Sequence, residues 1–167
     1  MQGSDYLLTC AEVAAALAGF SALVVAISDR GDPDVAAWSR GLVGSLIERS
    51  LFALFFSLVP VLLAGLEVAS PHLWFLCSGG LAVYIVSLAW RSSGLRRQDP
   101  MFSELVAGPA FATLMVLGVL VLALQLAHAI GIGLQQSVWW YLVGVTWLLG
   151  SVAYMFYFGI RRWARDA

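Results

Sequence analysis

Long apolar stretches separated by short polar breaks dominate the chain. A helix that spans a bilayer needs roughly 20 predominantly apolar residues, and five stretches reach that length. They cover about residues 6–28, 41–69, 72–91, 103–130 and 138–160. The breaks between them contain Gly, Pro, Asp and Ser, the residue types that favour turns. The pattern predicts an all-α integral membrane protein whose bundle of five transmembrane helices forms a single transmembrane domain, residues 1–167.

Composition excludes the other common classes of protein. Hydrophobic residues make up 61% of the chain and charged residues 11%, whereas about a quarter of residues are charged in soluble domains. Two cysteines and a formal net charge of -1 argue against a disulfide scaffold and against a nucleic-acid partner. The expected partners are the lipid bilayer and either further copies of the chain or a larger membrane complex.

The basic residues predict the orientation of the helices. All nine are arginines, and they flank alternate ends of the five stretches: Arg30, Arg40, Arg49, Arg91, Arg96, Arg97, Arg161, Arg162 and Arg165. Basic residues near span ends stay in the cytoplasm. We therefore expect the N-terminus outside and the C-terminus in the cytoplasm, and a location in the inner (plasma) membrane of a bacterium.

Residues at the helix ends refine this arrangement. Trp and Tyr favour the headgroup level, so Trp74 and Tyr141 are expected at the outer boundary and Trp90 and Tyr157 at the inner one. The second helix should begin before its apolar part, because Asp32 can cap a helix and Pro33 suits a first helical turn. We thus expect an amphipathic cytoplasmic lead into the second span.

Glu12 is the deepest acidic residue of the first span. It lies roughly 9 Å below Tyr6 at 1.5 Å per residue. The same helix carries small residues at helical spacing, Ala11, Ala15, Gly19 and Ala22, and such residues let neighbouring helices approach closely. We therefore expect the first helix to be the most protein-contacted of the five. Glu12 is either a proton or cation site or a carboxyl group that hydrogen-bonds across a packed interface.

The segment from Tyr6 to Val13, Tyr-Leu-Leu-Thr-Cys-Ala-Glu-Val, resembles the first helix of small multidrug-resistance transporters. In that family an Ala-Glu-containing helix carries the glutamate that exchanges protons for cationic drugs. The resemblance implies proton exchange at Glu12. It covers about a dozen residues, and that family has four helices and a shorter chain, so it serves as an analogy for Glu12 alone.

Further polar residues are expected at the outer face. Glu67 ends the second span, His72 opens the third, and Gln125 and His128 close the fourth. With Glu12 they bring polar groups from four helices to one membrane face, which favours a proton, cation or metal site there. The simpler interpretation is that each is solvated or hydrogen-bonded by itself.

Other features have mainly structural interpretations. Arg49 and Glu104 are expected to form an ion pair near the inner boundary. Cys10 and Cys77 have matching depths, so they either form a disulfide bond or remain buried thiols. Pro60 and the Gly108-Pro109 pair are expected to kink their helices.

The sequence leaves three functions open. No hydrolase, nucleotide-binding or zinc-protease motif is present, so enzyme activity is not expected. The first function is an oligomeric channel or transporter for protons or small cations that uses Glu12. The second is a non-catalytic accessory subunit of a larger complex. The third is a redox subunit in which His72 and His128 bind a haem or a metal; beyond that possibility the cofactor is unknown.

Overall fold

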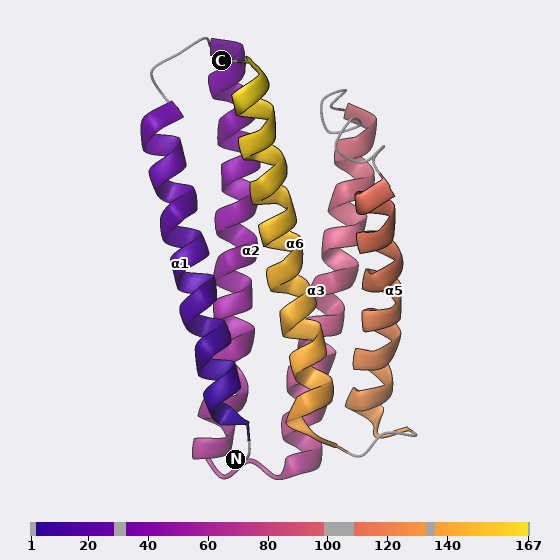
Figure 1. Ribbon diagram of the computed structural model, residues 1–167. Coiled ribbons are helices and arrows are strands. Elements are labelled where there is room, and N and C mark those ends of the chain that lie inside the picture. The colour runs from indigo at the N-terminus through magenta and orange to yellow at the C-terminus, as the bar shows by residue number, and fades with distance from the viewer. Residues whose placement is uncertain (1–2, 29–32, 99–108, 133–135, 167) are drawn as a thin grey trace. The chain divides into compact units, whose positions relative to one another are not determined.

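The computed structural model describes residues 3–28, 33–98, 109–132 and 136–166. In this part of the chain all regular structure is helical (Figure 1). The helices are α1 (Ser4–Ser28), α2 (Pro33–Gly65), α3 (Ser70–Gln98), α5 (Pro109–Ile130) and α6 (Val138–Asp166). Each contains an apolar segment long enough to cross a membrane, so the described residues form a five-span helical membrane protein.

The helices differ from their predicted bounds mainly at the ends. α2 begins at Pro33, as predicted from its helix-start signals, and ends at Gly65 rather than at residue 69. α3 and α6 continue past their apolar segments to Gln98 and Asp166, because a helix does not have to stop where the bilayer does. The described part of the fourth span begins at Pro109. The expected start at residue 103 and the Gly108 position lie outside the described residues.

Two helices end with the same hydrogen-bonded motif. At the end of α2 the Val68 amide donates to the Leu63 carbonyl and the Glu67 amide to the Ala64 carbonyl. After α5 the Ile132 and Gly131 amides bond in the same way. The motif needs a left-handed residue, for which glycine is preferred; Gly131 has φ 70° and Glu67 has φ 58°. Glu67 therefore holds a conformation that is unusual for a residue with a side chain.

The helices contribute to two compact units. Unit 1 comprises Met1–Gly3 and Val59–Trp147, and unit 2 comprises Ser4–Leu58 and Leu148–Ala167. α2 and α6 each supply residues to both units. The single transmembrane domain predicted from the sequence stays a prediction.

In unit 1, α3 and α5 lie side by side (Figure 1). α5 also packs closely against the first part of α6. A Cβ atom added at Gly118 of α5 would lie 2.6 Å from Cζ2 of Trp147 on α6. The Trp147 indole donates a hydrogen bond of 3.2 Å to the Leu114 carbonyl, one turn before Gly118. Glycine at position 118 thus makes room for the Trp147 side chain.

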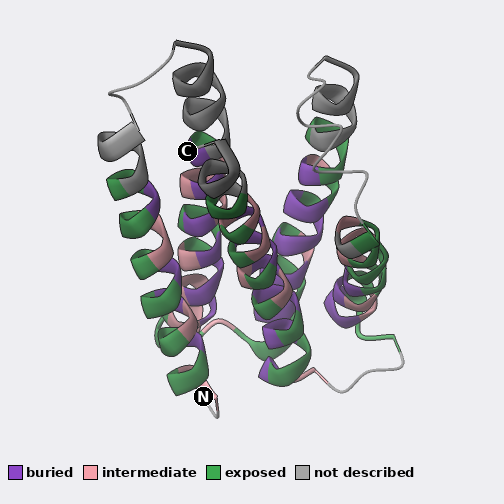
Figure 2. Cartoon of the chain, turned by 45° about the horizontal axis from the view of Figure 1, so that its top comes forward, coloured by how far each residue is buried: buried purple, intermediate pink, exposed green. Residues whose placement is uncertain are grey.

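In unit 2, α1 buries a narrow face formed by Leu7, Ala14 and Ser21. Only 22% of its apolar segment is buried, compared with 44% in α3 and in α6. Figure 2 shows the exposed residues of α1 in green along most of its length. The expectation that the first helix is the most protein-contacted one is therefore wrong for a single chain.

Candidate functional site

The described residues place two kinds of polar group in the spans, one buried in unit 1 and one exposed on α1. His128 and Gln125 on α5 are completely buried, as is Ser78 on α3. Glu12 on α1 is exposed. Polar side chains inside a membrane are costly and therefore mark candidate functional positions.

His128 uses both ring nitrogens. Its Nε2 atom accepts a hydrogen bond of 3.1 Å from the backbone N–H of Ser137, which lies between α5 and α6. Its Nδ1 atom lies 2.8 Å from Oγ of Ser78 on α3. A backbone N–H can only donate, so Nε2 carries no proton, and the proton of the neutral ring must be on Nδ1. His128 therefore donates to Ser78 and links three segments of unit 1.

Aromatic rings enclose this histidine. The Trp74 and His128 ring centroids are 5.2 Å apart, and the Trp74 and Tyr141 centroids are 5.9 Å apart. Trp74 is 4% exposed and Tyr141 0%. Both lie in the core of unit 1, and their expected depth at the outer headgroup level stays a prediction. Other aromatic residues near the helix ends are exposed: Tyr6, Trp90, Trp139 and Tyr157.

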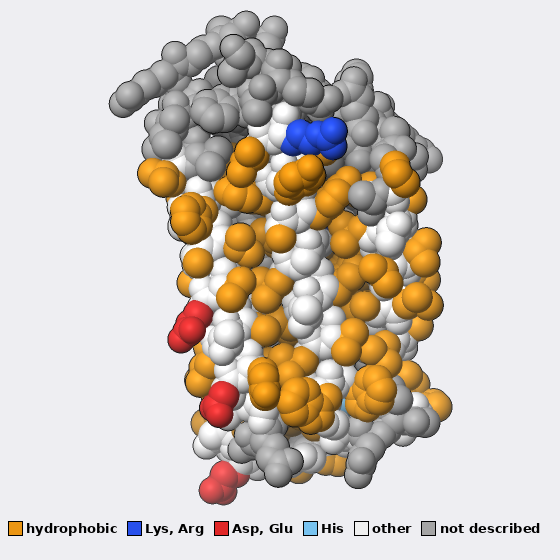
Figure 3. All heavy atoms as spheres, in the orientation of Figure 1, with side chains coloured by type: hydrophobic (Ala, Val, Ile, Leu, Met, Phe, Trp, Pro, Cys, Tyr) orange, Lys and Arg blue, Asp and Glu red, His pale blue; other side chains and the backbone are white. Residues whose placement is uncertain are grey.

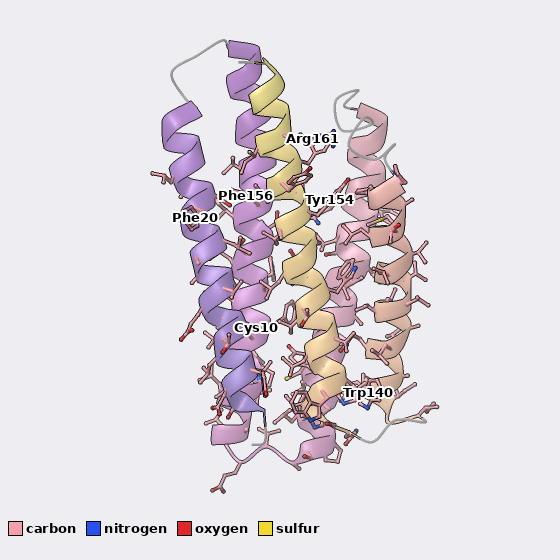
Figure 4. All side chains as sticks on the ribbon, in the orientation of Figure 1. Cys10, Phe20, Trp140, Tyr154, Phe156 and Arg161 are labelled. Carbon is pink, nitrogen blue, oxygen red and sulfur yellow. The ribbon has the colours of Figure 1, made fainter. Side chains whose placement is uncertain are left out.

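Gln125 lies one turn before His128. Its Nε2 atom donates a hydrogen bond of 2.8 Å to the carbonyl of Trp140, near the start of α6 (Figure 4). Its Oε1 atom is buried and accepts no hydrogen bond in the described part of the chain. Gly144 on α6 makes this contact possible, because a Cβ atom there would lie 2.8 Å from Nε2 of Gln125. The amide thus joins α5 to α6.

The structure brings together only part of the predicted outer site. Gln125 and His128 share one buried cluster, whereas the side chains of Glu67 and His72 are exposed. No group of three or more His, Cys, Asp or Glu residues that suits a metal ion occurs among the described residues. His128 would have to give up the Ser137 or Ser78 bond to coordinate a metal, so these residues do not fit the haem or metal site.

Glu12 points to the outside of the chain. Asp5, Glu12 and Gly19 are each two residues before Leu7, Ala14 and Ser21, the residues that α1 buries. Two residues correspond to about 200° around a helix, so the two rows lie on opposite sides. Figure 3 shows acidic side chains at the surface on the side of α1. No described residue forms a hydrogen bond or ion pair with the Glu12 carboxylate, and the space beside Gly19 is open.

The small residues predicted for helix packing divide between the two sides of α1. Ala11 is buried, but Ala15, Gly19 and Ala22 are exposed. Most of this row of small residues therefore faces away from the rest of the chain, and its role in helix packing stays a prediction. Phe20, labelled in Figure 4, is also exposed and lies beside this row.

The structure also bears on the two cysteines and on Arg49. Cys10 and Cys77 are both free thiols, so the structure contains no disulfide bond between them. Arg49 is half-buried in α2, but its expected partner Glu104 lies outside the described residues. The Arg49–Glu104 ion pair stays a prediction.

Sequence reasoning missed Ser78, Trp74, Tyr141 and Ser137 as members of the buried cluster. One signal was available: Trp74 and Ser78 are four residues apart, which places them on one face of a helix. The helix that this face contacts was not available from the sequence. Comparison of the chain with protein-family models, curated proteins and solved structures gives no match.

Proposed function

We propose that this membrane protein forms an oligomer of identical chains through the exposed face of α1, and that Glu12 binds a proton or small cation there. The observation that supports this most directly is the position of Glu12, which is exposed within a span and opposite the buried side of α1. In a bilayer, an exposed position faces either lipid or another protein. A carboxylate in contact with lipid is costly, so coverage by another protein is favoured.

The neighbouring residues suit a helix as the covering surface. Ala15, Ala16 and Gly19 surround Glu12 on the exposed side of α1, and small residues let helix backbones approach closely. Bulky residues are exposed on other spans, such as Val83 on α3 and Val119 on α5, and also on α1 itself, where Phe20 is exposed. On α1 the small residues next to Glu12 nevertheless leave space beside a carboxyl group.

Charge supports the choice of ligand. Every arginine of the chain belongs to the predicted cytoplasmic side. Arg49, which extends furthest into a span, is roughly 24 Å from the outer end of α2, whereas Glu12 is roughly 12 Å from the outer end of α1. A second copy in the same orientation therefore offers no arginine to Glu12. The negative charge is then balanced by a proton or a small cation.

Flux measurements in proteoliposomes test this function. Glu12→Gln removes the charge and keeps most of the side-chain shape, and we expect it to abolish pH-dependent proton or cation flux. Glu67→Gln is the matched control, because Glu67 is an exposed acid in the connection between α2 and α3. Parent-like flux in the Glu12→Gln protein would exclude Glu12 as the ion site.

The buried cluster favours a second candidate function, a non-catalytic accessory subunit. Ser78 and both nitrogens of His128 are engaged in bonds that hold helices together, as expected of a structural core. In that case the α1 face binds a different membrane protein. A chain that is monomeric when purified alone and inactive in liposomes would favour this function over the first.

Orientation is part of the proposal. With arginines only at one side of the five spans, Glu12 and His128 lie in the outer half of the membrane and the C-terminus in the cytoplasm. A reporter fused after Ala167 should give a cytoplasmic signal; a periplasmic signal would reverse the proposed topology.

A further inference from the structure

The hydrogen bonds of His128 depend on its protonation state. Nε2 accepts the Ser137 N–H only while it carries no proton. A doubly protonated imidazole has two donors and no acceptor. Protonation would therefore replace the hydrogen bond to Ser137 with a repulsive contact between two N–H donors.

Among the described side chains, no carboxylate bonds to His128. The buried titratable side chains of unit 1 are, besides His128, Cys77 and Tyr84 on α3 and Tyr141 on α6; none of these three is anionic near neutral pH. The other charged or titratable side chains that the structure describes in unit 1 are Glu67, His72 and Arg91. Glu67 and His72 are exposed at the connection of α2 and α3 and the start of α3, and Arg91 is exposed at the other end of the α3 span.

The location of the histidine decides what its protonation would change. His128 is three residues before Gly131, and its ring binds Ser137 across the connection that leads from α5 to α6. The Ser137 hydroxyl in turn accepts from the Trp139 amide at 3.4 Å, in the first turn of α6. Loss of the Ser137 bond would free the Ser137 amide just before α6, while the Gln125–Trp140 bond would still join the two helices.

We propose that His128 is a pH-sensitive joint: uptake of a proton at Nε2 breaks the bond to Ser137 and gives an open form in which the Ser137 amide is no longer held by α5. The proton comes from the aqueous phase at that end of the span, and no other group is consumed. An imidazolium ion buried in an apolar core is unfavourable, so the open form, in which the ring reaches water, is the one that holds the proton. This inference does not depend on the role of Glu12.

Hydrogen exchange at the Ser137 amide tests the joint in detergent-solubilised protein. A His72→Gln background leaves His128 as the single histidine. Opening takes up one proton, so it becomes more favourable as the pH is lowered. Below the pH at which the open form binds the proton, the protection factor of this amide, corrected for intrinsic exchange, should fall about tenfold for each unit by which the pH decreases. His128→Gln is the matched control, since its amide oxygen can accept the Ser137 N–H and does not titrate; its protection factor should stay constant.

Two further readouts keep the test decisive if the glutamine variant does not fold. Nitrogen NMR of the His128 ring should show the Nδ1–H tautomer at neutral pH and a doubly protonated ring over the range in which Ser137 loses protection. The fluorescence contributed by Trp74, obtained by subtracting a Trp74→Phe variant, should change over the same range because the indole contacts the ring. A protection factor that does not change between about pH 8 and about pH 4.5, or one that changes equally in His128→Gln, would overturn the proposal.

Discussion

The buried cluster around His128 and the exposed face of α1 manage polar groups in opposite ways. In the cluster, side chains from α3 and α5 bond to each other, to α6 and to the connection that precedes it, and Gly144 leaves the space that Gln125 needs. On α1, Glu12 is exposed beside small residues and open space. The hydrogen bonds of the first region all form within one chain, and only Oε1 of Gln125 accepts none among the described residues. The carboxylate of the second region has no such bond within the described part of the chain, which is why we propose that another molecule covers it.

The largest expected effect on stability comes from disrupting the buried cluster around His128. His128→Ala leaves the Ser137 N–H and the Ser78 hydroxyl without their partner and opens a cavity beside Trp74. We expect a loss of about 2–4 kcal/mol in the free energy of unfolding. Denaturant titration in detergent, followed by circular dichroism, measures it. Unchanged stability would show that the cluster does not hold unit 1 together.

Two glycine substitutions should have different effects on the free energy of unfolding, because one glycine is enclosed and the other is exposed. Gly118→Ala places a Cβ atom 2.6 Å from Trp147, whereas Gly19→Ala places one in open space. Overpacking costs about 1–3 kcal/mol, so Gly118→Ala should lower the unfolding free energy of the monomer. Gly19→Ala should leave it unchanged or raise it by up to about 1 kcal/mol, because alanine favours the helix more than glycine does. Equal losses in the two variants would contradict the different surroundings of these glycines.

The smallest expected effect concerns the connection of α2 and α3. Glu67 occupies a left-handed position with φ 58°, which glycine adopts without a steric penalty. Glu67→Gly should therefore stabilise the chain by up to about 1 kcal/mol, measured by the same denaturant titration. Flux that persists in this variant would show that the activity proposed for Glu12 does not depend on the backbone conformation of Glu67.

The sequence predicted the spans because length and hydrophobicity decide whether a helix crosses a membrane. It also identified Glu12 and small residues such as Ala15 and Gly19 at helical spacing on α1, since helix periodicity is a local property. It did not reveal that these residues face outward, because that depends on which helices pack together. The same limit applies to His128: its burial was not evident until α3 and α6 supplied Ser78, Trp74 and Tyr141.

Oxidative cross-linking in native membranes tests most directly whether the α1 face meets a second copy. In a background without Cys10 and Cys77, a single cysteine is introduced as Ala16→Cys on the exposed side of α1, and as Val119→Cys on the exposed side of α5 as the control. The proposed oligomer predicts a disulfide-linked dimer with Ala16→Cys and little with Val119→Cys, and disruption of the Ala16→Cys dimer by Gly19→Leu. A monomer in the Ala16→Cys protein, or equal dimer formation at the two positions, would contradict it.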